Sequence, residues 1–216
     1  MKRIVLYGAG GFGREVAYMI DCINYSFPGS YWFLGFVVGK EYYEPNQVVN
    51  GYPVLGTDEW LLANKDVYCV CTIADINIRA EVQERLSAQG VMFETLIAPY
   101  LPVPPSATIG KGCVISGQTM ISVNTKIGDG VFINSNVTLG HDVTIGNFCT
   151  VMPGTGISGN CVIGDRAFIG GHAFIVPGRK VGNGSTVAAG SIVFTNVKEG
   201  TTVLGNPAKR IEALEG

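Results

Sequence analysis

The sequence of 216 residues lacks a charge excess of either sign and has few charged residues altogether. Lys and Arg number 15 against 17 Asp and Glu, which gives a net charge of −2 and no basic surface for a nucleic acid. No segment approaches the ~20 consecutive apolar residues that a membrane span needs. The apolar run at residues 4–7 is too short for a secretory signal peptide. We therefore expect neither a nucleic acid nor a membrane as a partner.

The six cysteines show neither the spacing of a zinc site nor that of a small disulfide framework. Cys69 and Cys71 alternate along an apolar stretch that is typical of a buried strand. A reducing compartment is the simplest setting for such cysteines. We expect a cytoplasmic protein without a metal site.

A period of six residues runs through the second half of the chain. A helix has no such period and a strand alternates by two, whereas a strict hexad is typical of a parallel β-helix. Each hexad forms one side of a triangular coil, so the fifteen hexads between residues 103 and 193 predict five coils. The aliphatic positions are Val103, Ile109, Ile115, Ile121, Ile127, Ile133, Leu139, Ile145, Val151, Ile157, Ile163, Ile169, Ile175, Val181, Val187 and Val193.

A second position in each hexad calls for a small side chain. Four residues after each aliphatic position stands Ala, Cys, Thr, Val or Ser, with Arg179 as the exception. We expect these residues to point inward near the corners of the coil, which makes Cys113, Cys149 and Cys161 packing residues. Asn136 and Asn160 occupy turn positions where the backbone needs a positive φ.

The first hundred residues follow a different pattern. We predict strands at 4–7, 32–38, 67–72 and 91–96, with helices at about 14–22, 58–64 and 78–89. Alternating strands and helices indicate a small parallel sheet with helices on its faces. The expected fold is an α/β Rossmann-like half-domain over residues 1–100, followed by a β-helix over residues 101–216.

The first strand runs into a G-x-G-x-x-G motif that opens a helix, where a diphosphate would bind. Its residues are Gly8, Gly10, Gly11, Phe12 and Gly13. The motif fits a nucleotide-sugar diphosphate, a dinucleotide such as NAD, or merely a tight strand–helix turn. NAD is disfavoured, because no acidic residue for the ribose follows the second strand until Glu41 and because the domain has only half of a dinucleotide fold.

Three motifs in this order resemble one family. They are Gly-Ala-Gly-Gly-Phe-Gly-Arg-Glu-Val at residues 8–16, Gly-His-Asp-Val-Thr-Ile-Gly at residues 140–146 and Gly-Asn-Pro-Ala-Lys at residues 205–209. Together with the hexads, they resemble the bacterial sugar acyltransferases of the sialic acid O-acetyltransferase type, which include N-acetyltransferases of nucleotide-linked 4-amino sugars. The resemblance implies a left-handed β-helix, a homotrimer, acetyl-CoA as the donor and active sites between neighbouring subunits.

By this resemblance His141 is the catalytic base and Asp142 raises its basicity. His141 falls two places after inward Leu139, so it should project outward, as an ordinary solvated histidine would also do. A direct contact between the two side chains requires the corner of the coil to lie between them. Asn134 corresponds to a polar residue near the acceptor in relatives, or is simply a turn asparagine.

The resemblance also assigns the acetyl-CoA site. Gly159, Gly171 and Ala189 would offer backbone to the pantetheine arm, and Lys209 and Arg210 would meet the phosphates unless they are merely solvated. Thr150 stands where relatives often have a second histidine that contacts the donor. His172, the other histidine, falls in a different phase of the hexad from His141.

Two further departures concern the acceptor. Phe12 stands where relatives that use nucleotide-linked amino sugars often have histidine, and Val37-Val38 lack the acidic residues common after the second strand. Three functions remain open. The first is N-acetylation of a nucleotide-linked 4-amino sugar for a surface glycan, and the second is O-acetylation of a sialic acid-like or other small acceptor. The third is a non-catalytic trimeric scaffold.

Overall fold

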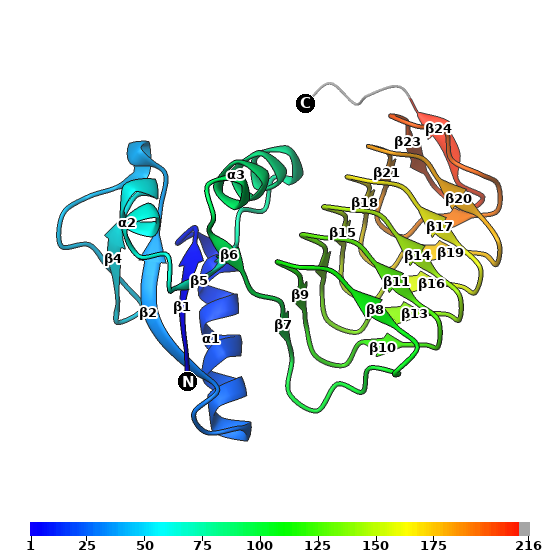
Figure 1. Cartoon of the computed structure of the whole chain (residues 1–216). Coiled ribbons are helices and arrows are strands. Elements are labelled where there is room, and N and C mark those ends of the chain that lie inside the picture. Colours follow the sequence, from blue (N-terminus) through cyan, green and yellow to red (C-terminus); the bar gives the residue numbers. More distant parts are fainter. Residues whose placement is uncertain (212–216) are drawn as a thin grey trace. The chain divides into compact units, whose positions relative to one another are not determined.

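The structure is a computed structural model that describes residues 1–211, in two compact units that divide between Pro99 and Tyr100 (Figure 1). In the described residues no helix is both long and apolar enough to cross a membrane, and no cluster of His, Cys, Asp and Glu forms a metal site.

The first unit is a sheet with strand order β3-β4-β2-β1-β5-β6, in which only the β3–β4 pair is antiparallel. Its strands are β1 (Lys2–Tyr7), β2 (Tyr31–Val37), β3 (Val48–Val49), β4 (Tyr52–Gly56), β5 (Tyr68–Cys71) and β6 (Met92–Phe93), and β7 (Leu96–Ile97) follows. Its helices are α1 (Gly11–Ser26), α2 (Asp58–Ala63) and α3 (Ile76–Ala88), with the 3-10 turn η1 (Lys40–Tyr42) after β2.

The predicted alternation of strands and helices is confirmed, with three differences. The β3–β4 hairpin was not expected, because β3 has two residues and Pro53 interrupts the apolar run of β4. Helix α1 begins inside the glycine motif instead of after it. The strand expected at residues 91–96 is split into β6 and β7.

The central strands of this sheet are buried from solvent. Ile4, Val5 and Leu6 of β1 have no exposed surface, and neither do Cys69 and Cys71 of β5. Desolvation by burial raises the pKa of the Cys71 thiol to about 11. The two thiols are therefore apolar packing groups, as the sequence indicated.

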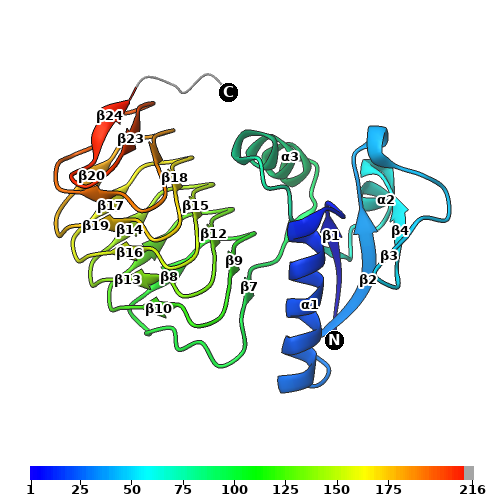
Figure 2. The same cartoon turned by 180° about the vertical axis from the view of Figure 1, so that it is seen from behind.

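The second unit is the expected left-handed β-helix, in which two-residue strands stack on three faces (Figures 1 and 2). Fifteen strands lie between Thr108 and Val193: β8 (Thr108–Ile109), β9 (Val114–Ile115), β10 (Met120–Ile121), β11 (Lys126–Ile127), β12 (Phe132–Ile133), β13 (Thr138–Leu139), β14 (Thr144–Ile145), β15 (Thr150–Val151), β16 (Gly156–Ile157), β17 (Val162–Ile163), β18 (Phe168–Ile169), β19 (Phe174–Ile175), β20 (Lys180–Val181), β21 (Thr186–Val187) and β22 (Ile192–Val193). Each pairs in parallel with the strand 18 residues away, as Ile133 does with Val151. The stack closes with β23 (Thr202–Leu204) and the antiparallel β24 (Lys209–Ile211).

The hexad positions behave as predicted. The aliphatic residues from Ile115 to Val193 are buried, whereas Val103 and Ile109 at the start of the series are half-buried. The small residues four places after each aliphatic position are buried, except half-buried Ala107 and Arg179. The third residue after each aliphatic position from Ile109 to Val187 has a positive φ, including Asn136 at 58° and Asn160 at 59°. This left-handed residue makes the corner of the coil.

Candidate functional site

The glycine motif forms the N-terminus of α1, where an anion can bind. The N-cap residue Gly10 offers no side chain to the first turn of the helix, and that turn contains no acidic residue. The dipole of the helix favours a negative ligand at this N-terminus. The arrangement suits the diphosphate that the motif predicted.

Only two of the glycines are required by the fold of the turn. Gly8 has φ +116°, and a Cβ on Gly13 would overlap the carbonyl of Gly8. Gly10 and Gly11 have open space where a Cβ would stand, apart from an Arg14 nitrogen 3.9 Å from the Gly11 position. Side chains there would fit sterically but would occupy the space at the N-terminus of α1 where an anion would bind.

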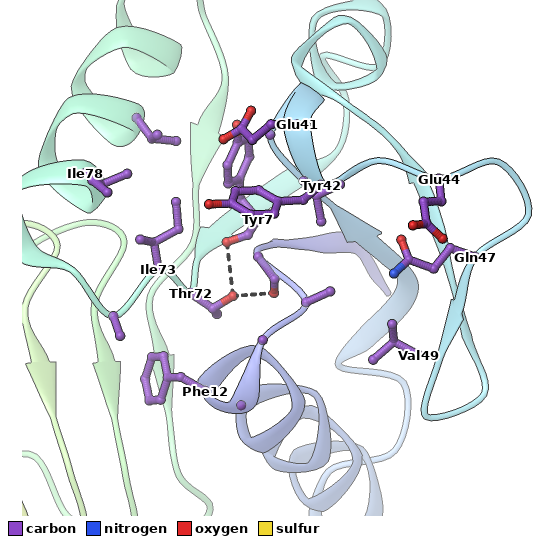
Figure 3. Close-up of a pocket in the computed structure, with 18 residues that line it drawn as sticks. Tyr7, Phe12, Glu41, Tyr42, Glu44, Gln47, Val49, Thr72, Ile73 and Ile78 are labelled. Carbon is purple, nitrogen blue, oxygen red and sulfur yellow. Dashed lines mark hydrogen bonds between the residues drawn. The ribbon is translucent and has the colours of Figure 1, made fainter.

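Figure 3 shows the cavity of about 630 Å³ beside this turn. The Thr72 hydroxyl, at the end of β5, donates to the Gly8 carbonyl at 2.8 Å and ties the turn to the neighbouring strand. Phe12 also lines the cavity. Within the described residues the lining consists of Tyr7, Gly8, Ala9, Gly10, Gly11, Phe12, Val38, Gly39, Glu41, Tyr42, Glu44, Gln47, Val49, Thr72, Ile73, Ala74, Ile78 and Val82.

The structure brings acidic residues to the cavity that the sequence did not assign. Val37 and Val38 carry no acid, but η1 turns the chain after β2 so that Glu41 lines the cavity, followed by Glu44. A carboxylate therefore stands close to where the ribose of a bound nucleotide lies in such folds. The signal in the sequence was Glu41 itself, displaced by a turn that the local pattern did not reveal.

Buried polar groups support this cavity from below. Arg79 is fully buried and donates to the carbonyl oxygens of Ile73 and Ala74 at 3.1 and 3.2 Å, which holds the β5–α3 loop. The Tyr7 hydroxyl donates to Asp58, and burial together with that carboxylate holds the pKa of Tyr7 well above its usual value. The floor of the cavity is therefore rigidly hydrogen-bonded.

The second site lies at a corner of the β-helix. His141 Nδ1 lies 2.8 Å from Asp142 Oδ2, and both side chains are about half exposed. The contact is possible because Asp142 has φ +58°, so the corner of the coil separates the two residues as the sequence argument required. Hydrogen bonds from His141 first and then from Asn124 Nδ2, at 3.0 Å, lower the pKa of Asp142.

Because an ionised carboxylate only accepts hydrogen bonds, the Nδ1 atom of His141 carries the proton in this pair. The Nε2 atom then presents a lone pair. Gly159 of the next coil lies beneath the ring, and a Cβ there would stand 2.5 Å from Nε2. The pair therefore lies at the surface of the solenoid, with Gly159 of the neighbouring coil against the ring.

The other residues assigned to acetyl-CoA are spread over several corners. Gly159 lies against His141, whereas Gly171 and Ala189 belong to the corner that follows β18 and β21. Thr150 is buried on a further face, paired with Phe132 and Phe168. Of these positions, Gly159 alone is shown to lie against His141 among the described residues of one chain.

Asn134 and His172 have local structural roles. The Asn134 side-chain oxygen accepts the backbone N–H of Ser135 at 2.8 Å, as a turn asparagine does. His172 occupies a left-handed corner with φ 56°. Its ring packs against Gly154, so closely that a Cβ on Gly154 would stand 2.6 Å from Nδ1 of His172. It lines a cavity of about 420 Å³ with Thr138 and Phe174.

The two cations near the C-terminus, Lys209 and Arg210, lie around one cavity. Lys209 and Arg210 on β24 line a cavity of about 350 Å³ with Lys198, which the sequence did not single out. Three cations around one cavity suit an anionic ligand such as the phosphates of a coenzyme.

We expect Asp142→Asn to lower kcat about tenfold, the effect of one weakened orienting hydrogen bond. Asparagine tolerates the left-handed backbone of this corner, so the fold should not change. Steady-state kinetics with a melting curve tests this. Unchanged kcat at unchanged stability would show that Asp142 does not orient His141.

Comparisons with known proteins agree with both units. Residues 3–86 match the PglD N-terminal domain, and residues 124–159 match the bacterial transferase hexapeptide repeat. GDP-perosamine N-acetyltransferase of Escherichia coli O157:H7 is 35% identical over 142 residues, which cover 63% of this chain and 61% of that protein. The chain thus spans less than two thirds of this curated relative.

Two solved structures match over nearly the full length. The acetyltransferase domain of PglB from Neisseria gonorrhoeae FA1090, in complex with acetyl coenzyme A, has a TM-score of 0.86 at 31% identity, covering 97% of this chain and 99% of that one. PerB from Caulobacter crescentus, in complex with CoA and GDP-perosamine, has a TM-score of 0.87 at 25% identity, covering 98% of each chain.

An α/β unit of the PglD N-terminal type followed by a hexapeptide β-helix defines a class of acyltransferases. Within that class, the chain belongs to the hexapeptide-repeat sugar acetyltransferases of the sialic acid O-acetyltransferase type, which include the N-acetyltransferases of nucleotide-linked amino sugars.

Proposed function

We propose that the protein transfers an acetyl group from acetyl-CoA to the amino group of a nucleotide-linked 4-amino sugar, with His141 as general base. The observation that carries this proposal is the 2.8 Å His141–Asp142 contact, which leaves Nε2 with a lone pair beside Gly159. The cavity at the glycine turn supports a nucleotide on the acceptor. The related PglB domain is in complex with acetyl coenzyme A, and PerB is in complex with CoA and GDP-perosamine.

The reaction needs one proton acceptor and no covalent enzyme intermediate. The sugar nitrogen attacks the thioester carbonyl carbon while Nε2 of His141 takes its proton. The carbon–sulfur bond then breaks, and the imidazolium returns the proton to the departing CoA thiolate. A backbone N–H suffices to stabilise the oxyanion. Cys113, Cys149 and Cys161 are buried in the coil, in keeping with direct transfer.

The decisive assay is thiol release from acetyl-CoA with a panel of acceptors. Nucleotide-linked 4-amino sugars should support turnover, and the product should be an amide. Turnover only with free sialic acids or other hydroxyl acceptors would replace the proposal by O-acetylation. No turnover with any sugar, despite acetyl-CoA binding, would favour a non-catalytic scaffold.

We expect acetyl-CoA to stabilise the protein and NAD to leave its melting temperature unchanged. A ligand at a hundred times its Kd contributes about 2.7 kcal/mol, which for a chain of this size raises Tm by about 5–10 °C. NAD should fail because the sheet built around β1 contains one glycine turn and no second mononucleotide-binding half. A shift with NAD but none with acetyl-CoA in thermal-shift measurements would contradict the assignment.

We also expect a homotrimer. One flat face of the β-helix exposes large apolar side chains, with Met120 at 53% and Phe174 at 45%, and a neighbouring subunit would cover them. Light scattering should give about three times the chain mass of 22.9 kDa. A monomer mass would remove the basis for active sites shared between subunits.

A further inference from the structure

The pair Asn-Gly occurs twice in the sequence, once in each unit, as Asn50-Gly51 and Asn183-Gly184. Asparagine is a chemically labile residue, and it is most labile before glycine, where no side chain covers the next backbone nitrogen. In this reaction the glycine nitrogen attacks the side-chain carbonyl carbon of the asparagine. Two identical pairs in one chain therefore show what two local structures do to the same chemistry.

Asn183-Gly184 lies at a corner of the β-helix, where both reacting groups are held. The backbone N–H of Gly184 donates to the carbonyl of Asp165 at 2.8 Å. The Oδ1 atom of Asn183 accepts the backbone N–H of Asp165 at 2.9 Å. The nitrogen must lose its proton and the side chain must turn toward it, so this pair reacts only when the corner opens.

Asn50-Gly51 is the two-residue loop of the β3–β4 hairpin, in which Val49 pairs with Tyr52. The φ angles of 49° at Asn50 and 84° at Gly51 are those of a type I′ turn. Both residues are exposed, and within residues 1–211 no backbone carbonyl accepts a hydrogen bond from the N–H of Gly51. A Cβ on Gly51 would meet no atom within 4 Å, so the surroundings of this nitrogen are open.

The hairpin around this turn is short. Strand β3 has two residues, and its Val48 is 62% exposed. Two-stranded hairpins of this kind are marginally stable, and exposed loop tips open at the least free energy. Opening lets Asn50 leave its left-handed conformation and bring its side-chain carbonyl to the Gly51 nitrogen.

We propose that Asn50-Gly51 is a site of spontaneous deamidation, and that isoaspartate formed there loosens the β3–β4 hairpin beside the glycine-turn cavity. The Gly51 nitrogen loses its proton, bonds to Cγ of Asn50 and displaces ammonia, which leaves a cyclic imide. Water then opens the ring at one carbonyl or the other and gives aspartate or isoaspartate. In the isoaspartyl product the main chain is one carbon longer, and a carboxylate replaces the amide.

The change reaches the cavity because the same hairpin lines it. Figure 3 shows Gln47 and Val49 at one side of the cavity. The backbone N–H of Val54 donates to the Gln47 carbonyl at 2.8 Å, and Val49 pairs with Tyr52. A longer main chain at the tip disturbs this register, which the two-residue turn fixes. The effect on an acceptor rests on the proposed function, since it takes this cavity as the acceptor's site.

Mass mapping of the full-length protein after incubation at neutral pH tests the site itself. Tryptic peptides 41–65 and 181–198 contain Asn50 and Asn183. In the folded protein the amide-to-acid mass increase should appear at Asn50 at least about tenfold faster than at Asn183, because the corner must first open. In guanidinium chloride the two should react at similar rates. Equal rates in the folded protein, or an unmodified Asn50 while the unfolded chain reacts, would overturn the proposal.

The aged protein tests the effect on the hairpin. Its Val54 amide should exchange with solvent faster than in fresh protein. The KM for the acceptor should rise about 2- to 10-fold, the effect of one weakened contact, while kcat stays unchanged. Unchanged exchange at Val54 in fully isoaspartyl protein would overturn the loosening of the hairpin.

Asn50→Gly should abolish both effects of incubation, because glycine has no amide to lose and keeps the positive φ of the turn. Asn46→Gly is the matched control, since Asn46 is also exposed in this segment and also has a positive φ, 61°. This variant should deamidate at Asn50 like the wild type. Ageing effects that persist in Asn50→Gly would place the reaction elsewhere and overturn the proposal.

The mass and transfer experiments fail separately. Conversion at Asn50 without acetyl transfer to any sugar would sink the proposed function and leave the modification site intact. Acetyl transfer to a 4-amino sugar by a protein whose Asn50 stays an amide would sink the modification site and leave the proposed function intact.

Discussion

His141→Ala should lower turnover by about 10²–10⁴-fold, the usual effect of removing a general base. The side chain is about half exposed and fills no part of the core, so its loss opens no cavity. The mass in solution, the melting temperature and the affinity for acetyl-CoA should therefore remain those of the wild type. The measurement is kcat on the true acceptor, with a binding titration of acetyl-CoA alongside.

His172→Ala is the matched control for this experiment. His172 has the same residue type, is also exposed and also lies at a corner of the coil, but among residues 1–211 no carboxylate accepts a hydrogen bond from its ring. Its removal should cost less than that of either His141 or the carboxylate of Asp142. Near-normal turnover of His141→Ala would mean that another group accepts the proton, or that the amine arrives unprotonated.

Gly159→Ala should lower kcat about 10- to 100-fold while the protein stays folded, the effect expected when the catalytic group is misplaced by about 1 Å. The added methyl group would stand 2.5 Å from Nε2 and 2.7 Å from Cε1 of His141. The imidazole is the free end of a side chain and can swing aside, so the energetic cost to the fold is small. The same movement takes the base out of position.

Gly171→Ala provides the comparison for this substitution. It occupies the same place in the hexad, but the nearest atom to an added Cβ is the Pro153 carbonyl oxygen at 3.2 Å, and His141 is not among its neighbours. Any effect should appear in KM for acetyl-CoA and not in kcat. An unchanged kcat for Gly159→Ala would show that the ring position seen here is not needed for catalysis.

The sequence alone determined the architecture of the β-helix. The hexad of aliphatic residues is a repeat in which each coil contacts only its neighbours, so the local pattern and the fold carry the same information. Burial of every aliphatic position from Ile115 to Val193 follows directly from it. The outward direction of His141 followed from its place two residues after Leu139.

The tertiary structure decided which residues surround each candidate group. Gly159 is 18 residues from His141 in sequence and packs against its ring only because the coils stack. Glu41, Glu44 and Gln47 reach the cavity beside the glycine turn through a 3-10 turn and a short hairpin, neither of which has a period that a sequence pattern can reveal. A repeat is encoded locally, whereas a binding site is assembled from turns whose positions depend on long-range packing. The sequence by itself therefore determined the class of fold and the candidate base, and only the tertiary structure decided what lies around them.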